Sequence, residues 1–144
     1  MALDHGASHL LFWDSDVGGD DAPRILQGMV GSNVDLIAAP YARKNRTAGP
    51  THSNDGGHVA MGFTLLSHAC MARMVEAYAS TLTFGDQVDG KVIPTVALFQ
   101  LMLAHGTMLG EDFSFCERWK QIGGSVYLYE EPGLKLSHVG ATIY

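Results

Sequence analysis

The chain has 144 residues, the size of one domain, and 47% of them are hydrophobic while 17% are charged, which supplies a core and argues against disorder. Nine lysines and arginines against 15 aspartates and glutamates leave a formal charge of −6, which disfavours general binding to nucleic acids or to anionic membranes, because both need a positive field. No apolar run approaches the ~20 residues of a membrane span, no signal peptide is recognisable, and two cysteines are too few for a disulfide framework. We therefore expect a soluble, cytoplasmic, single globular domain with buried free thiols.

The first predicted elements are a helical turn and a strand. Residues 2–6 suggest the last turn of a helix that Gly6 closes, because glycine adopts the left-handed conformation that follows a helix end. The apolar run 9–13 lies between this turn signal and the acidic tripeptide 14–16, a pattern typical of a buried strand. The tripeptide is thus expected at the carboxyl end of a strand.

A helix and a second strand follow. Asp20 and Asp21 are acidic capping residues and Pro23 suits a first turn, so a helix is predicted to begin here and to end at Gly31. Its apolar stripe comprises Ile25, Leu26, Met29 and Val30. Residues 34–39 predict a buried strand, and a strand–helix–strand unit favours parallel pairing of its two strands.

The segment 43–57 breaks this pattern, because it is rich in Gly, Asn, Thr and Ser and has no hydrophobic periodicity. We expect a flexible loop of ~15 residues, a length that is usually functional or disordered within a compact domain. The histidines and the aspartate in 52–58 have the composition of a metal site, but a mobile loop is the favoured interpretation.

Beyond the loop, apolar residues 60–66 predict a strand, and Ser67 is expected to cap a helix. The apolar positions of this helix, spaced i, i+3, i+4 and i+7, are Met71, Met74, Val75 and Tyr78. The polar stretch 82–91 suggests a hairpin with its turn at either 85–86 or 89–90.

The segment 94–105 is compatible with either a helix or a strand. Glu111 and Asp112 are predicted to begin a helix that ends at Gly123-Gly124 and is followed by a strand over 125–129. The shared apolar face of this helix comprises Phe115, Trp119 and Ile122.

Asp14 and Asp16 form the sharpest chemical feature. Carboxylates at i and i+2 on an extended segment project to the same side, and ligands of open α/β sheets bind at the carboxyl ends of strands. Such hard oxygen ligands suit Mg²⁺ or Mn²⁺, which can hold a diphosphate. The alternative is a solvated loop whose acids cap a helix.

Further groups of residues follow this tripeptide in order. They are 35–41 with Lys44, 61–66, 110–119, and the C-terminal pieces 123–124, 127–128 and 136–140. Together they resemble the metal-dependent GT-A-fold glycosyltransferases, from about Gly6 to the C-terminus. The resemblance implies an α/β fold, with a mixed sheet flanked by helices, in one GT-A-like domain over residues 1–144.

The resemblance also implies a metal centre. Asp14 and Asp16 match the acidic motif that holds the Mn²⁺ or Mg²⁺ ion bridging the diphosphate of a sugar nucleotide. His138 matches the histidine that completes the coordination. The cation would act as a Lewis acid on the nucleoside-diphosphate leaving group.

The remaining implied roles concern the substrates. Asp112, or its neighbour Glu111, matches the acidic pair that supplies the base for the acceptor hydroxyl. Met61 and Gly62 match the strand beneath the sugar and acceptor. Arg43, Lys44 and Arg46, at the start of the loop, either meet the phosphates or merely solvate the loop.

The chain departs from the family in one respect. Family members carry a nucleotide-binding half before the acidic motif, whereas the motif here starts at Asp14. We therefore expect a truncated domain, the metal and acceptor half. Without upstream neighbours, strand 9–13 is expected to present an unpaired edge, which predicts a homo-oligomer.

Three hypotheses for the function remain open. The first is a glycosyltransferase that moves a sugar from a nucleoside-diphosphate sugar to a hydroxyl acceptor. The second is a non-catalytic remnant that acts through self-association. The third is a divalent-metal hydrolase that uses Asp14, Asp16 and histidines, which fits the acids but not the order of the groups.

Overall fold

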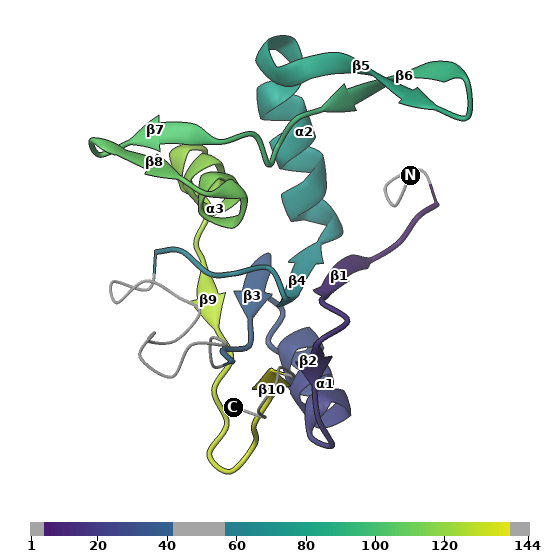
Figure 1. The fold of residues 1–144 in the computed structure, drawn as a ribbon. Coiled ribbons are helices and arrows are strands. Elements are labelled where there is room, and N and C mark those ends of the chain that lie inside the picture. Colours follow the sequence, from purple (N-terminus) through teal and green to yellow (C-terminus); the bar gives the residue numbers. More distant parts are fainter. Residues whose placement is uncertain (1–4, 42–56, 139–144) are drawn as a thin grey trace.

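The computed structural model describes residues 5–41 and 57–138 (Figure 1). The helices are α1 (Ala22–Gly31), α2 (His68–Leu82) and α3 (Glu111–Gln121). The strands are β1 (His9–Trp13), β2 (Val17–Gly18), β3 (Leu36–Ala38), β4 (Phe63–Ser67), β5 (Thr83–Val88), β6 (Lys91–Val96), β7 (Met102–Ala104), β8 (Thr107–Leu109), β9 (Tyr127–Leu128) and β10 (Ser137–His138). The mixed α/β class is confirmed, whereas the loop expected over 43–57 lies outside the described residues, apart from Gly57.

The central sheet has four strands in the order β1-β4-β3-β9. Strand β4 is antiparallel to both β1 and β3, and β3 pairs in parallel with β9. The expected direct pairing of the first two strands is therefore wrong. β1 and β3 do run in the same direction, but β4 lies between them, where its nearly continuous apolar sequence is buried on both faces.

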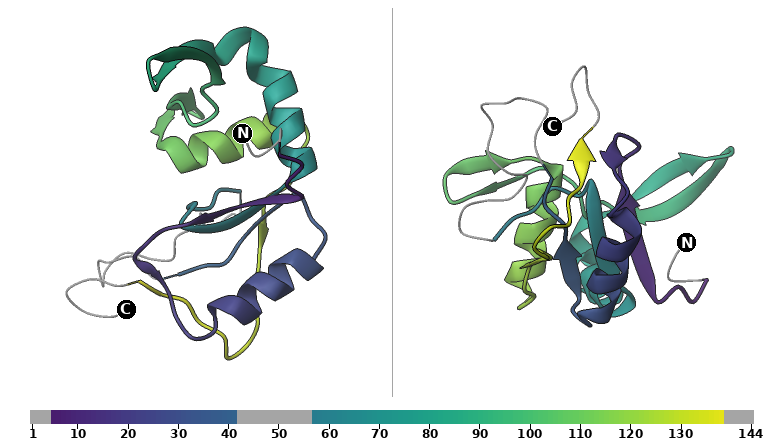
Figure 2. Two further views of the ribbon diagram at one scale, coloured as in Figure 1. Left: turned by 90° about the vertical axis from the view of Figure 1, so that its right-hand side faces the viewer. Right: turned by 90° about the horizontal axis from the view of Figure 1, so that it is seen from below.

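Helix α1 covers one face of the sheet, and α2 and α3 cover the other (Figure 2). Successive side chains of a strand point to opposite faces, so β3 contributes to two cores. Leu36 and Ala38 pack in the core beneath α2 and α3, while Ile37 and the following Ala39 pack in the core beneath α1.

Helix α1 begins and ends where predicted, but its N-terminal cap and its buried stripe differ from the prediction. Asp21 occupies the N-cap position without a side-chain cap hydrogen bond, and its carboxylate instead accepts one from the Lys135 amide at 3.0 Å. Ile25 and Met29 are buried, whereas Val30 is 46% exposed. The buried stripe of α1 is therefore narrower than the apolar stripe predicted from its sequence.

Helix α2 begins as predicted. The Ser67 hydroxyl accepts a hydrogen bond from the Cys70 amide at 3.0 Å, which satisfies one of the unpaired donors of the first turn. Ser67 also donates to Asp35 at 2.6 Å, so the cap ties α2 to the entry of β3.

Helix α3 is buried on more sides than the predicted apolar face. Phe115 and Trp119 lie in the core as expected, but Arg118 is also buried, because the segment leading to β7 covers it. The Arg118 guanidinium donates to the carbonyls of Leu98 at 2.9 Å and Gln100 at 2.6 Å. The helix therefore anchors the hairpin of β7 and β8.

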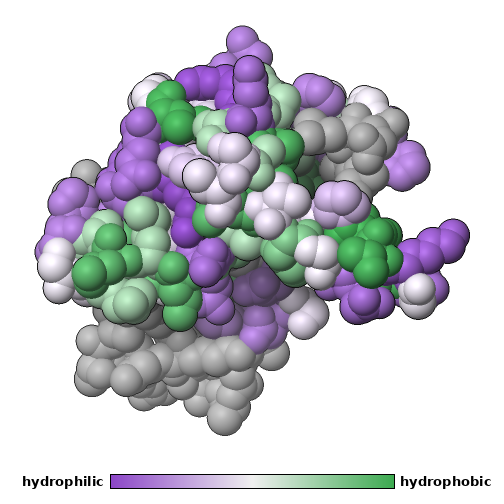
Figure 3. All heavy atoms as spheres, turned by 90° about the horizontal axis from the view of Figure 1, so that it is seen from above, coloured by the Kyte–Doolittle hydropathy of each residue, from purple (hydrophilic) through white to green (hydrophobic). Residues whose placement is uncertain are grey.

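Both hairpins end in two-residue turns. Asp89 and Gly90 connect β5 to β6 with φ angles of 49° and 75°, so the second of the two predicted turn positions is the observed one. The undecided segment 94–105 contains the end of β6 and all of β7, and no helix. Figure 3 shows hydrophobic side chains exposed on each hairpin; they include Phe84, Val88, Val92, Leu103 and Met108.

Strand β1 forms an edge of the sheet, as expected. Its residues are only half-buried and Trp13 is 50% exposed, in contrast to the buried strand predicted for 9–13. The difference arises because β1 pairs on one side only within the described part of the chain. Pairing of this edge with a second copy stays a prediction.

Cys70 in α2 and Cys116 in α3 are buried and free, as predicted. Burial raises the pKa of the Cys70 thiol to about 12 and that of Cys116 to about 11. Since the thiolate is the reactive form, both side chains serve as core residues. Within residues 5–41 and 57–138, no helix combines the length and hydrophobicity that crossing a membrane requires.

Candidate functional site

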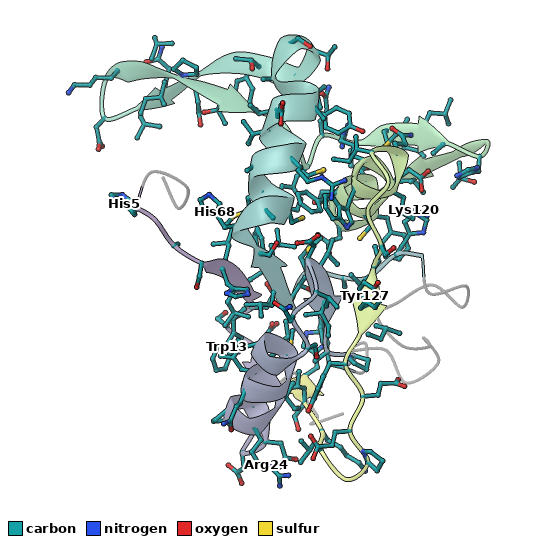
Figure 4. All side chains as sticks on the ribbon, turned by 180° about the vertical axis from the view of Figure 1, so that it is seen from behind. His5, Trp13, Arg24, His68, Lys120 and Tyr127 are labelled. Carbon is teal, nitrogen blue, oxygen red and sulfur yellow. The ribbon has the colours of Figure 1, made fainter. Side chains whose placement is uncertain are left out.

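The acidic tripeptide forms the turn between β1 and β2. The Asp14 amide donates to the Gly62 carbonyl at 2.9 Å, and the Val17 amide donates back to the Asp14 carbonyl at 3.0 Å. The Trp13 indole, labelled in Figure 4, donates to the Val17 carbonyl at 2.6 Å and so spans the turn. These contacts hold the carboxylates of Asp14 and Asp16 at the carboxyl end of β1.

The C-terminal strand brings His138 to this turn. β10 pairs antiparallel with β2, which sets His138 opposite Val17. The His138 Nε2 atom lies 3.5 Å from Asp16 Oδ2, and the imidazole is 14% exposed. Two residues from opposite ends of the chain, both predicted from sequence to serve one site, are therefore in contact.

Tyr41 completes the same cluster, although the sequence reasoning did not single it out as a functional residue. It follows the carboxyl end of β3 and lies edge-on to the His138 ring, with ring centroids 5.3 Å apart at 86°. A Cβ atom on Gly62 would stand 2.1 Å from the Tyr41 hydroxyl and 2.7 Å from Asp14 Oδ2. Glycine is required there because these two oxygens occupy the space of a side chain.

The pKa of Tyr41 is raised by its burial and by the carboxylates around it. Burial raises its pKa to about 12, and the charge of Asp14 adds to the rise. A backbone hydrogen bond of Gly62 acts in the opposite direction, while the charges of Asp112 and Asp16 raise the pKa further. Tyr41 is thus a neutral phenol at physiological pH, set among acidic groups.

Asp112 lies in the first turn of α3 and faces this cluster. Its Oδ2 accepts a hydrogen bond from the Met61 amide at 3.0 Å. Burial raises the pKa of Asp112, the Met61 bond lowers it, and the charges of Glu111 and Asp14 raise it again, with a net increase. Glu111 is exposed, and both acids line a pocket of about 270 Å³ at the start of α3.

The described part of the chain therefore gathers most of the predicted site residues. Those that lie around Gly62 are Asp14, Asp16, Met61, Asp112 and His138, together with Tyr41. Met61 and Gly62 contribute backbone groups to it, since Met61 is itself buried in the core. The remaining candidate, Lys44, lies outside the described residues.

The donor chemistry of this cluster suits a hard divalent cation, because it combines carboxylates with an imidazole. Ligand atoms in octahedral coordination with bonds of about 2.1 Å lie about 3 Å from one another, close to the 3.5 Å between Asp16 Oδ2 and His138 Nε2. Across residues 5–41 and 57–138, however, no three His, Cys, Asp or Glu side chains are already arranged as a metal site. Asp16 and His138 are in contact, and Asp14 is the third candidate ligand.

A second polar cluster lies on α3 around the buried Glu117. Its Oε2 is 3.0 Å from His58 Nε2 and 2.9 Å from Lys120 Nζ, and its Oε1 is 3.2 Å from His105 Nε2. Lys120 is labelled in Figure 4, and the His58 ring stacks on Phe113 at 5.0 Å. The cluster joins the segment before β4, helix α3 and the turn of the β7–β8 hairpin.

Glu117→Gln is expected to change the acid stability of the protein. Burial alone would raise the pKa of Glu117, but hydrogen bonds from Lys120, His58 and His105 outweigh it and lower the pKa to about 2. A lowered carboxyl pKa stabilises the fold above the unfolded value of about 4.5, and this contribution disappears as the pH falls toward 2. The variant should therefore lose roughly 2–3 kcal/mol at pH 7, and the deficit should close between about pH 5 and pH 2.

Urea unfolding of both proteins at several pH values measures this deficit. Glu76→Gln, at an exposed position of α2, is the matched control and should stay within about 0.5 kcal/mol of the wild type. A deficit that is the same at pH 7 and at pH 2.5 would show that the Glu117 charge does not stabilise the fold.

No protein-family model, curated protein or solved structure matches the chain. What the site does is therefore inferred from its own geometry and chemistry.

Proposed function

We propose that the chain is a metal-dependent, GT-A-like glycosyltransferase domain that moves a sugar from a nucleoside diphosphate to an acceptor hydroxyl. One observation carries the proposal: Asp16 contacts His138 beside the carboxyl ends of β1 and β3, and the charges of Asp14 and Asp112 act on the neighbouring Tyr41. That edge is where α/β sheets bind ligands. The same three aspartates and the histidine are the ones that the resemblance to this family selects in the sequence.

The metal would be held by Asp16 and His138, with Asp14 as the third ligand. A divalent cation supplies Lewis-acid stabilisation of the negative charge that develops on the leaving diphosphate. The chain contributes the donor atoms from two separate elements, the β1–β2 turn at two positions and β10 at one. Because β2 and β10 pair directly, backbone hydrogen bonds hold His138 next to the turn that carries Asp14 and Asp16.

Asp112 is the base of the proposed reaction. The Met61 amide holds its Oδ2, so Oδ1 takes the proton as the acceptor oxygen forms its bond to the anomeric carbon. The bond from that carbon to the diphosphate oxygen breaks in the same step, and its electron pair leaves with the diphosphate. Burial raises the pKa of Asp112, which makes its carboxylate a stronger base than an exposed aspartate.

A homo-oligomer formed through the edge of β1 stays a prediction beyond this chemistry.

Asp16→Ala tests the metal centre. Isothermal titration with Mn²⁺, followed by UDP, should show metal binding and then metal-dependent nucleotide binding for the wild type, and no Mn²⁺ signal for the variant. Asp16 is half-exposed in a turn, so circular dichroism should show an unchanged fold. Asp86→Ala, on the β5–β6 hairpin, removes one aspartate elsewhere and should bind Mn²⁺ like the wild type.

The other outcomes discriminate between the hypotheses. Mn²⁺ binding without nucleotide binding would favour a divalent-metal hydrolase, and the absence of both signals would favour a non-catalytic domain. Persistent Mn²⁺ binding by the Asp16→Ala protein would mean that the proposed ligand set is wrong.

A further inference from the structure

We infer that Tyr41 is a positioning residue of this site, whose ring orients His138 toward Asp16 and whose hydroxyl holds Asp14 on the same side. The inference rests on the proposed function only for the identity of the bound cation. The placement of Tyr41 between two of the three donor side chains is a property of the fold.

The ring of Tyr41 restrains His138. The two rings meet edge to face, at 5.3 Å and 86°, an arrangement that aromatic pairs favour. The backbone supports it, because Tyr41 forms a parallel bridge with Leu136, two residues before the histidine. Tyr41 and Leu136 are both buried, at 7% and 6% exposure, so the ring has little freedom to turn away from the imidazole.

The hydroxyl of Tyr41 acts on Asp14. It lies over Gly62, with Asp14 Oδ2 beside it, within the space that one Cβ atom would fill. The backbone of Asp14 is held by the bond from its amide to Gly62 and by the bond that its carbonyl accepts from Val17. A phenol at this point is a neutral donor that can fix a carboxylate without adding a further charge to an acidic cluster.

Tyr41 therefore links the turn that carries Asp14 to the strand that carries His138. Groups that orient metal ligands from behind typically contribute 10–100-fold to metal affinity. A positioning role also explains why a large, buried aromatic residue with a hydroxyl lies among acids, three residues after the end of β3.

Two substitutions separate the two contributions of Tyr41. Tyr41→Phe keeps the ring and removes the hydroxyl, so we expect Mn²⁺ affinity to fall by about 10-fold. Tyr41→Leu removes the ring as well and should weaken Mn²⁺ binding by about 100-fold. Tyr129→Phe is the matched control, because it removes a hydroxyl that bonds to a carboxylate elsewhere, Glu131 at 2.6 Å, on the α1 side of the sheet; it should leave Mn²⁺ binding unchanged.

A second measurement needs no metal. The imidazole resonances of His138 in the metal-free protein should be sharp and shifted by the Tyr41 ring in the wild type and in Tyr41→Phe. In Tyr41→Leu they should lose that shift and broaden. Circular dichroism of each variant establishes that the fold is retained.

The outcomes are distinguishable. Unchanged His138 resonances in Tyr41→Leu, or wild-type Mn²⁺ affinity in both Tyr41 variants, would overturn the positioning role. A wild type that does not bind Mn²⁺ would refute the proposed metal centre, while the His138 resonances would still decide whether Tyr41 orients the imidazole.

Discussion

Asp112→Asn is expected to lower the rate of sugar transfer by about 10²–10⁴-fold, which corresponds to about 3–5 kcal/mol of transition-state free energy. Asparagine retains an oxygen that can accept the Met61 amide, so the start of α3 should keep its position. The asparagine amide, however, cannot take the proton of the acceptor hydroxyl. The rate is measured as UDP released from a panel of UDP-hexoses in the presence of Mn²⁺.

Glu111→Gln is the control for this experiment. The two acids are adjacent in sequence, but Glu111 is exposed and Asp112 is half-buried in contact with Met61. The control should therefore retain most of the activity. The reverse result, with Glu111→Gln inactive and Asp112→Asn active, would assign the base to Glu111.

The rate should also depend on pH in a predictable direction. Burial raises the pKa of Asp112, so the carboxylate needed as a base is lost at a higher pH than for an ordinary aspartate. The acid limb of the rate profile should lie above the usual aspartate range in the wild type and be absent from the residual activity of Asp112→Asn.

Trp119→Ala is expected to destabilise the fold by about 3–5 kcal/mol, because it opens a cavity in the core beneath α2 and α3. Trp119 is fully buried, and its indole donates to the Ser125 carbonyl at 2.9 Å. The Arg73 guanidinium lies 4.6 Å above the ring, and Gly124 packs so closely that a Cβ there would stand 2.0 Å from the indole. Urea unfolding followed by circular dichroism measures the loss.

Two further substitutions separate the loss of buried volume from the loss of the hydrogen bond to Ser125. Trp119→Phe keeps most of the volume and leaves the Ser125 carbonyl without its donor, so about 1–3 kcal/mol should be lost. Leu103→Ala, at a side chain that is 67% exposed, should change stability by no more than about 0.5 kcal/mol. A Trp119→Ala protein as stable as Leu103→Ala would contradict the assignment of Trp119 to the core.

The elements whose signals are local were predictable. Ser67 caps α2 through a bond within its own first turn, and α3 begins at Glu111 and ends just before the glycine pair. Hairpin turns need left-handed backbone conformations, so only two positions for the β5–β6 turn had to be considered, and Asp89-Gly90 is the observed one.

The burial of α3 could not be read from its own residues. Glu117 and Arg118 carry full charges, and a helical pattern assigns charged positions to solvent. They are buried because the segment before β7 supplies carbonyls to Arg118, and the turn of the β7–β8 hairpin supplies an imidazole to Glu117. Buried charge is tolerated only when it is paired, and the pairing groups come from other segments of the chain.

The candidate site likewise contains residues that the sequence nominated and one residue that only the structure revealed. The position of Asp14 and Asp16 after a predicted strand was sufficient to nominate them, because that is a short-range pattern. The resemblance to glycosyltransferases nominated His138 and the Glu111-Asp112 pair. Neither could nominate Tyr41, whose role arises from contacts with residues far from it in sequence.

What the sequence determined by itself is therefore the α/β class, the starts of the three helices, and the ends of α1 and α3. Tertiary structure alone decided that β4 inserts between β1 and β3, that β10 returns to pair with β2, and that Tyr41 stands between Asp14 and His138. The physical reason is that helix periodicity, capping and turn conformation depend on residues within a few positions of each other. Strand order and the meeting of side chains across the sheet depend on which distant apolar surfaces bury each other best.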